Sequence, residues 1–415
     1  MMAEGIITLM GSGELTSTMV EVHKELLTRI PSPPRPVFID TPAGFQLNSD
    51  QISRRALEYF QTRVGQRMEL ASFRSSDISE SEAEKAYRSL REANYYLIGP
   101  GSPSYAVRHW KKSLVPDILG RGIEEGACLV AASAAALTIG SKTLPVYEIY
   151  KVGQPLHWLE GIDILGRFGF DLVIIPHWNN MEGGTHDTRF CYMGEPRFRE
   201  LEAGLPDGTG VLGLDEHTGL ILDLREQTGE IRGIGMVTLR IGGRDRTFHK
   251  GESFPLSLLR DGPKEYLSPA TPAPEKRSDK IKEGISFWKR IHSAEEGFKQ
   301  GLEEFAPDKL TAAILELDGI IWEAHRDLES EEFIAQAREI FRELVVLLGV
   351  RIESWPGSRR DCLAPLIELL LNTRKRLRDR REWEAADALR SGLQRLGIAI
   401  EDTDKGTRWH LEEKS

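Results

Sequence analysis

The sequence predicts an α/β domain with a mostly parallel sheet, followed by a mainly α-helical domain. Between residues 6 and 241, short apolar runs alternate with amphipathic stretches of helix length, which is typical of parallel strands covered by helices. After residue 276, apolar residues recur three and four positions apart, which indicates helices. The chain has 415 residues, more than one hydrophobic core usually organises.

The apolar runs of strand length give the expected order of the sheet elements. They lie at residues 6–10, 37–40, 95–99, 128–132 and 171–176. Two later runs, 220–224 and 231–241, flank the polar turn 225–230 and predict a hairpin at the sheet edge.

A stretch rich in proline and polar residues separates the two predicted domains. Residues 262–276 (GPKEYLSPATPAPEK) show no apolar periodicity and have the composition of a linker. We therefore expect an α/β domain at 1–261, a linker with a lead-in helix at 262–289 and a helical domain at 290–415. Within the last domain, Gly397 predicts the end of a helix before a short strand at 398–401.

Composition excludes some classes of protein. The formal net charge of −10 argues against a globally basic nucleic-acid coat but allows a local basic patch. The three cysteines lack the short paired spacings of zinc or redox sites, so we expect a reducing cytoplasm. Neither a signal peptide nor a membrane span is expected, because the first apolar run is only of strand length.

The segment 125–140 (EGACLVAASAAALTIG) carries the candidate nucleophile, Ser133. An apolar strand leads directly into small residues around one serine, as in the strained strand-to-helix elbow whose usual pattern is GxSxG. Both glycine positions hold alanine here, Ala131 and Ala135, which keeps the small size but loses free access to positive φ. The alternative is a serine that caps a buried helix start.

A nucleophilic serine needs a base and a carboxylate that orients the base. His177 follows an apolar strand, at the edge where α/β sheets gather their ligand sites, and Glu148 lies fifteen residues after Ser133. A structural histidine is the alternative interpretation. The loop 99–105 (GPGSPSY) also follows a strand and is suited to present backbone N–H groups to an oxyanion, or it is an ordinary turn.

The combination of GPGSPSY, AASAAA, PHW and GLDEHTGLILD resembles the dipeptidase E and cyanophycinase clan, within the class I glutamine amidotransferase-like superfamily. The resemblance covers about residues 5–250. It implies a flavodoxin-like three-layer sandwich and hydrolysis of an amide bond, in a peptide or small molecule, through an acyl-enzyme. It implies no cofactor.

The same resemblance implies roles for individual residues. Ser133 would be the nucleophile, His177 the base and Glu148 the acidic position. Positions that match the oxyanion loop, the residue after the nucleophile and the acidic segment are Gly101, Ser102, Ala134, Asp215 and Glu216.

Residues 177–199 are dense in histidine, carboxylate, amide and arginine side chains. A metal site is one interpretation, but the spacing matches no HExxH pattern and no cysteine pair is present, so we expect no metal. A polar substrate loop is favoured, in which Arg189 grips a carboxylate bidentately. A surface loop without a ligand is the remaining alternative.

The helical domain contains a basic run at 373–382 (TRKRLRDRRE), with five arginines and one lysine. Such a face can bind phosphates, although most charge runs are merely solvated. Residues 381–411 (REWEAADALRSGLQRLGIAIEDTDKGTRWHL) closely resemble the C-terminal end of cysteinyl-tRNA synthetase, and the resemblance extends more loosely upstream to about residue 290.

The signatures of the synthetase's catalytic portion are missing, so aminoacylation is not expected. The resemblance implies contact with tRNA through Arg374, Arg376, Arg378, Arg390 and Arg408, with Trp409 as a stacking surface. The alternative is a module retained for packing or homodimerisation, in which Trp409 belongs to the core.

Two hypotheses for the whole protein follow from these patterns. The first is an amide hydrolase that uses Ser133, His177 and Glu148 and carries a tRNA-contacting module. The second is a non-catalytic ligand- or tRNA-binding protein, in which the altered elbow has lost turnover.

Overall fold

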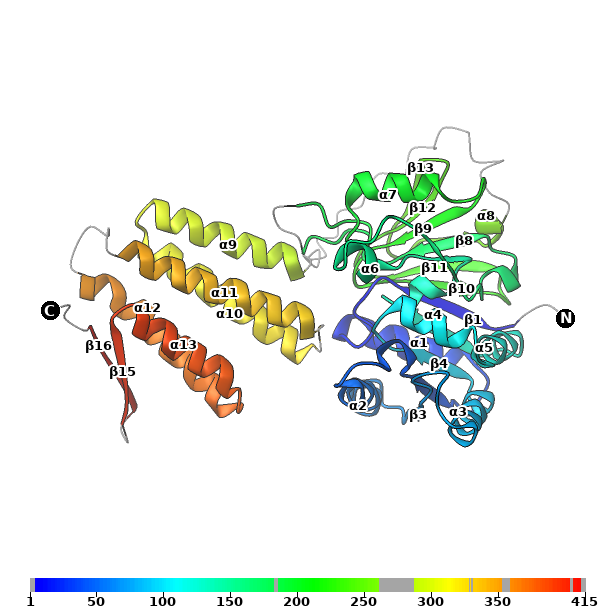
Figure 1. Cartoon of the computed structure of the whole chain (residues 1–415), viewed down its shortest axis with the longest axis horizontal. Coiled ribbons are helices and arrows are strands. Elements are labelled where there is room, and N and C mark those ends of the chain that lie inside the picture. Colours follow the sequence, from blue (N-terminus) through cyan, green and yellow to red (C-terminus); the bar gives the residue numbers. More distant parts are fainter. Residues whose placement is uncertain are drawn as a thin grey trace. The chain divides into compact units, whose positions relative to one another are not determined.

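The computed structural model describes residues 4–182, 186–260, 287–327, 329, 331–352, 359–403 and 406–411. The chain divides into two compact units, residues 1–284 and 285–415 (Figure 1). Most of the expected linker and lead-in helix, 262–289, lies outside the described residues, and 287–289 begin helix α9 (Phe287–Glu303).

The first unit is built on a sheet that has eight strands among the described residues. Its order is β14-β11-β10-β1-β5-β4-β2-β3. The strands are β1 (Ile6–Met10), β2 (Pro36–Ile39), β3 (Glu69–Ala71), β4 (Tyr95–Ile98), β5 (Cys128–Ala132), β10 (Thr218–Asp223), β11 (Thr228–Gly233) and β14 (Ser253–Pro255).

The five strands β1, β5, β4, β2 and β3 are parallel. On the other side of β1, β10 pairs with β1, β11 with β10 and β14 with β11, each antiparallel. The order β3-β2-β4-β5 matches the first four positions of a flavodoxin-like sheet, and the N-terminal strand β1 occupies the fifth. The predicted fold class is therefore confirmed.

A second sheet of the first unit differs from the prediction. It has the order β13-β12-β9-β8, with β8 (Leu172–Ile175), β9 (Gly210–Leu214), β12 (Val237–Ile241) and β13 (Arg244–Phe248). The run 171–176 thus belongs to this sheet, and the run 231–241 is divided between the two. The reason is Gly233, which takes φ 95° and leads the chain out of β11, so that Val237 pairs with Leu214.

Helices and the second sheet cover the main sheet. The helices are α1 (Val20–Arg29), α2 (Ser49–Tyr59) with a π-helical end (Phe60–Val64), α3 (Glu80–Glu92), α4 (Pro103–Trp110), α5 (Val115–Glu124), α6 (Val146–Tyr150), α7 (Gly194–Ala203) and α8 (Ser257–Arg260). Because side chains alternate along a strand, Ile7 and Leu9 share one core with α3, α5 and the second sheet. The outer face of the second sheet packs on Phe198 and Leu201 of α7.

The second unit is helical, as predicted (Figure 1). After α9 come α10 (Pro307–Arg326), α11 (Glu331–Ile352), α12 (Arg359–Asp379) and α13 (Trp383–Arg395), then a hairpin of β15 (Ile398–Thr403) and β16 (Gly406–Leu411). Gly397 takes φ 73°, the left-handed conformation expected after a helix end. In the described parts of both units, no helix has the length and apolar character needed to cross a membrane.

A buried histidine lies on the face of the main sheet opposite α3 and α5. His23 of α1 is fully buried, and its Nε2 donates to the carbonyl oxygen of Glu14 at 2.6 Å. Its Nδ1 therefore accepts from the Tyr95 hydroxyl, 2.7 Å away. Burial lowers the pKa of His23 from its ordinary 6.5 to about 4, because the charged ring would lose its hydration.

This depressed pKa predicts a loss of stability in mild acid. The unfolded chain binds a proton near pH 6.5 but the folded chain only near pH 4, so the free energy of unfolding falls as the pH drops through this window. Between pH 7 and pH 5 the difference is about 2 kcal/mol. Urea unfolding at both pH values should show this decrease in the wild type and a smaller one in His23→Gln, which cannot titrate. Equal decreases in both proteins would contradict the assignment.

Candidate active site

The serine elbow forms at the carboxyl end of β5. Ser133 takes φ 50°, and its N–H donates to the carbonyl oxygen of Met10 at 3.0 Å. In the described segment 131–135, Ser133 is the one residue with positive φ, so Ala131 and Ala135 need no glycine freedom at their positions. Both alanines are completely buried. The alanine substitutions in the elbow pattern are therefore compatible with its geometry.

The Ser133 hydroxyl lies in hydrogen-bonding contact with a histidine. The distance from Ser133 Oγ to His177 Nε2 is 2.7 Å. His177 follows β8 at φ 50°, and its Nδ1 lies 3.0 Å from Glu216 Oε1. Because a carboxylate accepts, Nδ1 carries the proton, and Nε2 is left with the lone pair that can receive the serine proton.

Two asparagines hold the Glu216 carboxylate and backbone in place. Asn180 Nδ2 donates to the same Oε1 at 3.2 Å, and the Glu216 N–H donates to Asn179 Oδ1 at 2.9 Å. Asn180 and Glu216 are both buried. The carboxylate therefore sits in a fixed, largely dry position behind His177.

The position of Glu148 differs from the prediction. Glu148 lies on α6, and its Oε2 accepts a hydrogen bond from Ser104 Oγ of α4 at 2.8 Å. The carboxylate against His177 Nδ1 is that of Glu216. The reason is strand order: His177 follows β8 and Glu216 follows β9, and these two strands are parallel neighbours whose carboxyl ends meet.

Asp215, next to Glu216, has a supporting position. Its Oδ2 accepts from the Met236 N–H at 2.9 Å. Burial raises the pKa of the Asp215 carboxyl to about 6, the Met236 N–H opposes this shift, and the Glu216 charge adds to it. The Asp215 carboxyl thus holds the backbone of Met236 beside the turn at 215–217.

The glycine-rich loop after β4 has a backbone position that requires glycine. Gly101 takes φ 145°, and a Cβ atom there would approach the carbonyl oxygen of Pro42 to 2.1 Å, so only glycine fits. The Ser102 N–H differs from the prediction, because it already donates to Pro42 O at 2.9 Å. Among the described residues, no backbone acceptor engages the N–H of Gly101 or of Ala134.

A strained turn that the sequence did not predict lies against His177. Phe190, Cys191 and Tyr192 take φ values of 57°, 54° and 69° in succession. The Cys191 N–H donates to the His177 carbonyl oxygen at 3.2 Å, and the Tyr192 ring lies 6.1 Å from the His177 ring. Left-handed conformations cost roughly 1–2 kcal/mol per residue, so the surrounding fold must hold them.

Arg189 also differs from its predicted role. Its guanidinium forms a bidentate pair with Asp187, at 2.9 Å for each bond, and contacts Glu195 Oε2 at 3.1 Å. An incoming carboxylate would have to displace these two acids. In the part of the chain that the structure describes, no group of three or more His, Cys, Asp or Glu side chains is arranged to hold a metal ion.

The arginines predicted to contact tRNA are in unequal positions. The Arg374 side chain is only 4% exposed and forms a bidentate pair with Asp402, with both distances 2.9 Å, so it is not accessible to a phosphate. Arg376 pairs with Asp318, and Arg378 pairs with Asp402 at 2.7 Å. Arg408 is exposed and Arg390 is half-buried.

Trp409 lies in strand β16, opposite Ile400 of β15. It is partly buried against the core of the second unit. One side of the ring thus contributes to packing, as the packing alternative expected, and the rest remains accessible.

The C-terminal part of the chain is similar to a domain of cysteine–tRNA ligases. Residues 360–409 match the family model of the cysteinyl-tRNA ligase anticodon binding domain. A cysteine–tRNA ligase of Heliobacterium modesticaldum is 37% identical over 82 residues, which cover 20% of this chain and 17% of that protein. One from Dehalococcoides mccartyi is 30% identical over 282 residues, 65% of this chain and 56% of that protein. The resemblance predicted for the C-terminal module is confirmed.

These relatives are matched over only part of their length. The chain spans 17–19% of the first three cysteine–tRNA ligases and 56% of the one from Dehalococcoides mccartyi.

Two solved structures align with about three fifths of the chain. A peptidase from an acI-B1 Actinobacterium has a TM-score of 0.49 and 18% identity, and covers 61% of this chain and 97% of its own. A Listeria monocytogenes protein assigned as peptidase E has a TM-score of 0.37 and 10% identity, and covers 60% and 99%.

Proposed function

We propose that the first unit is a serine hydrolase of amide bonds, with Ser133 as nucleophile, His177 as base and Glu216 as the carboxylate that orients the base. The observation that supports it best is the 2.7 Å contact between Ser133 Oγ and His177 Nε2. This distance is within the range that proton transfer requires.

The proposed reaction proceeds in two halves. Ser133 Oγ attacks the amide carbonyl carbon while its proton passes to His177 Nε2. When the C–N bond breaks, the departing amine takes that proton and an acyl-enzyme remains. Water then attacks the ester, giving its proton to His177, and the protonated His177 returns a proton to Ser133 Oγ as the acid leaves. The Glu216 carboxylate stabilises the imidazolium in both halves.

The proposal also assigns the groups that stabilise the negative charge of the tetrahedral intermediate. The N–H groups of Gly101 and Ala134 are the candidate donors to the tetrahedral oxyanion, because Ser102 N–H is occupied by Pro42. Each oxyanion donor is typically worth roughly 3–4 kcal/mol in the transition state. Glu148 and Ser104, hydrogen-bonded at 2.8 Å, remain polar groups at this sheet edge without an assigned chemical role.

A fluorophosphonate probe tests the nucleophile. We expect one adduct on the full-length wild-type protein, detected by intact mass, and none on Ser133→Ala, because the adduct requires a hydroxyl activated by His177. Ser104→Ala is the matched control, since it removes another hydroxyl of the same sheet edge and should still be labelled.

A wild-type protein that remains unlabelled, or a Ser133→Ala protein that labels equally, would contradict the serine mechanism. The first result would favour the non-catalytic binding protein.

We also propose that the protein is cytoplasmic. A further proposal is that the second unit contacts tRNA. The match to an anticodon binding domain at 360–409 supports the contact. With Arg374 buried and Arg376 and Arg378 paired to acids, the candidate phosphate contacts are Arg390 and Arg408, and Arg378 only if it exchanges Asp402 for a phosphate.

Salt dependence of tRNA binding tests this contact. The affinity of the full-length chain for tRNA should fall as salt rises from 50 to 200 mM, since phosphate contacts release counterions. Arg408→Gln should weaken binding and reduce the slope of log K against log salt by about 1. Arg91→Gln, an exposed arginine of the first unit, should change neither. Binding that is absent or insensitive to salt would contradict the proposal.

A further inference from the structure

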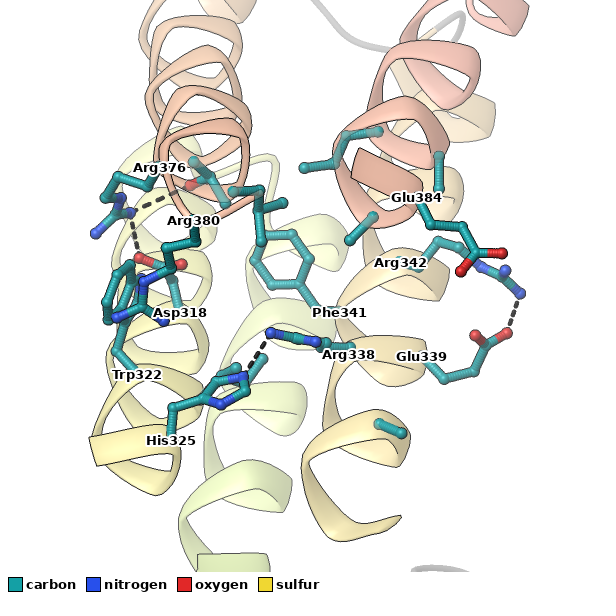
Figure 2. Close-up of a pocket in the computed structure, with 17 residues that line it drawn as sticks. Asp318, Trp322, His325, Arg338, Glu339, Phe341, Arg342, Arg376, Arg380 and Glu384 are labelled. Carbon is teal, nitrogen blue, oxygen red and sulfur yellow. Dashed lines mark hydrogen bonds and ion pairs between the residues drawn. The ribbon is translucent and has the colours of Figure 1, made fainter. Parts of the chain in front are cut away.

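The helical unit contains a pocket that the hydrolase proposal does not use. It has a volume of about 350 Å³ and is lined by residues of α10, α11, α12 and α13. This volume lies at the lower end of the range for small-molecule sites. Figure 2 shows its side chains converging between the helices.

One part of the pocket wall is apolar. Phe341 of α11 projects toward the centre of the pocket (Figure 2). The other apolar lining residues are Ile321, Ala335, Leu377, Ala385, Ala388 and Leu389. This wall can bury the ring or hydrocarbon body of a ligand.

Another part of the pocket wall is cationic and aromatic. Arg380 lies across the Trp322 ring, and Arg376 also lies over this ring, 5.5 Å from its centroid (Figure 2). Arg338 donates to His325 Nε2 at 2.5 Å on the same side. Three guanidinium groups and a tryptophan face therefore line one end.

These arginines are not equally neutralised. Arg376 pairs with Asp318, and Arg338 pairs with Glu382 at 2.5 Å. In the described residues, no carboxylate lies within ion-pair distance of Arg380. Partial desolvation lowers the pKa of the Arg380 guanidinium, the Glu382 carboxylate opposes this shift, and the charges of Arg338 and Arg376 add to it. An anion placed here would relieve this repulsion.

We propose that this pocket binds a small organic anion, with its carboxylate or phosphate on Arg380 and its apolar or planar body against Phe341. Guanidinium groups bind both head groups through paired N–H donors. The stacking of Arg380 on the Trp322 ring holds the Arg380 guanidinium in place before the ligand binds. This inference is independent of the hydrolase proposal, because no residue of the Ser133 site takes part.

Calorimetric titration of the full-length protein tests the inference with three probes of similar shape. 1-Naphthyl phosphate and 1-naphthoate carry the two head groups, and 1-naphthalenemethanol is the neutral control. We expect one of the anions, or both, to bind with one site per chain and the alcohol to bind at least roughly tenfold more weakly, since it forms no charge-assisted hydrogen bond. Which anion binds more tightly identifies the head group.

Two variants locate the binding. Arg380→Gln should weaken binding of the anion roughly tenfold or more. Arg395→Gln removes the same charge from an exposed position of α13 that does not line the pocket, and should leave the affinity within about threefold. Circular dichroism of both variants reports whether the helices are intact.

Three results would overturn the inference: no binding of either anion, equal binding of the neutral alcohol, or equal losses in Arg380→Gln and Arg395→Gln. Ser133→Ala should bind the anions like the wild type, which separates this test from that of the hydrolase.

Discussion

The candidate site depends on two sharp backbone turns at strand ends. Ser133 and His177 both adopt φ 50°, immediately after β5 and two residues after the end of β8, so each side chain leaves its sheet edge and meets the other at 2.7 Å. Six of the ten described non-glycine residues with positive φ lie in or beside this site: Ser133, His177, Phe190, Cys191, Tyr192 and His217. Such strain persists only where the surrounding packing fixes the backbone, as the buried cores under both sheets do here.

The sequence was sufficient to predict the α/β class and the helical second unit, and it indicated Ser133 and His177, whose side chains the structure places 2.7 Å apart. Apolar periodicity identifies buried strands, and small residues around one serine identify an elbow. The partner of His177 could not be predicted in this way, because Glu216 becomes its neighbour only through the parallel pairing of β8 with β9. The run 210–214 contains two glycines, which are depleted in strands, so apolar periodicity predicts neither this strand nor the position of the acidic segment after it.

Charge patterns were the least reliable guide to binding residues. The basic run 373–382 suggests a uniform phosphate-binding face, but the helix turns its arginines in different directions. Arg374 is buried on Asp402, Arg376 meets Asp318, and Arg380 covers Trp322. The partners come from α10 and β15, far away in sequence, which local patterns do not reveal. Arg374 alone of these arginines is buried, whereas Arg376 and Arg380 form part of the cationic end of the pocket.

The central claim is that Glu216 orients His177 toward Ser133. The most direct measurement compares the second-order rate of fluorophosphonate labelling in wild type, Glu216→Gln and Glu148→Gln. The account predicts a decrease of roughly two orders of magnitude or more in Glu216→Gln, because the imidazole loses its tautomer and charge partner. It predicts a rate within about threefold of wild type in Glu148→Gln, whose carboxylate bonds to Ser104. A large decrease in Glu148→Gln with normal labelling of Glu216→Gln would contradict the account.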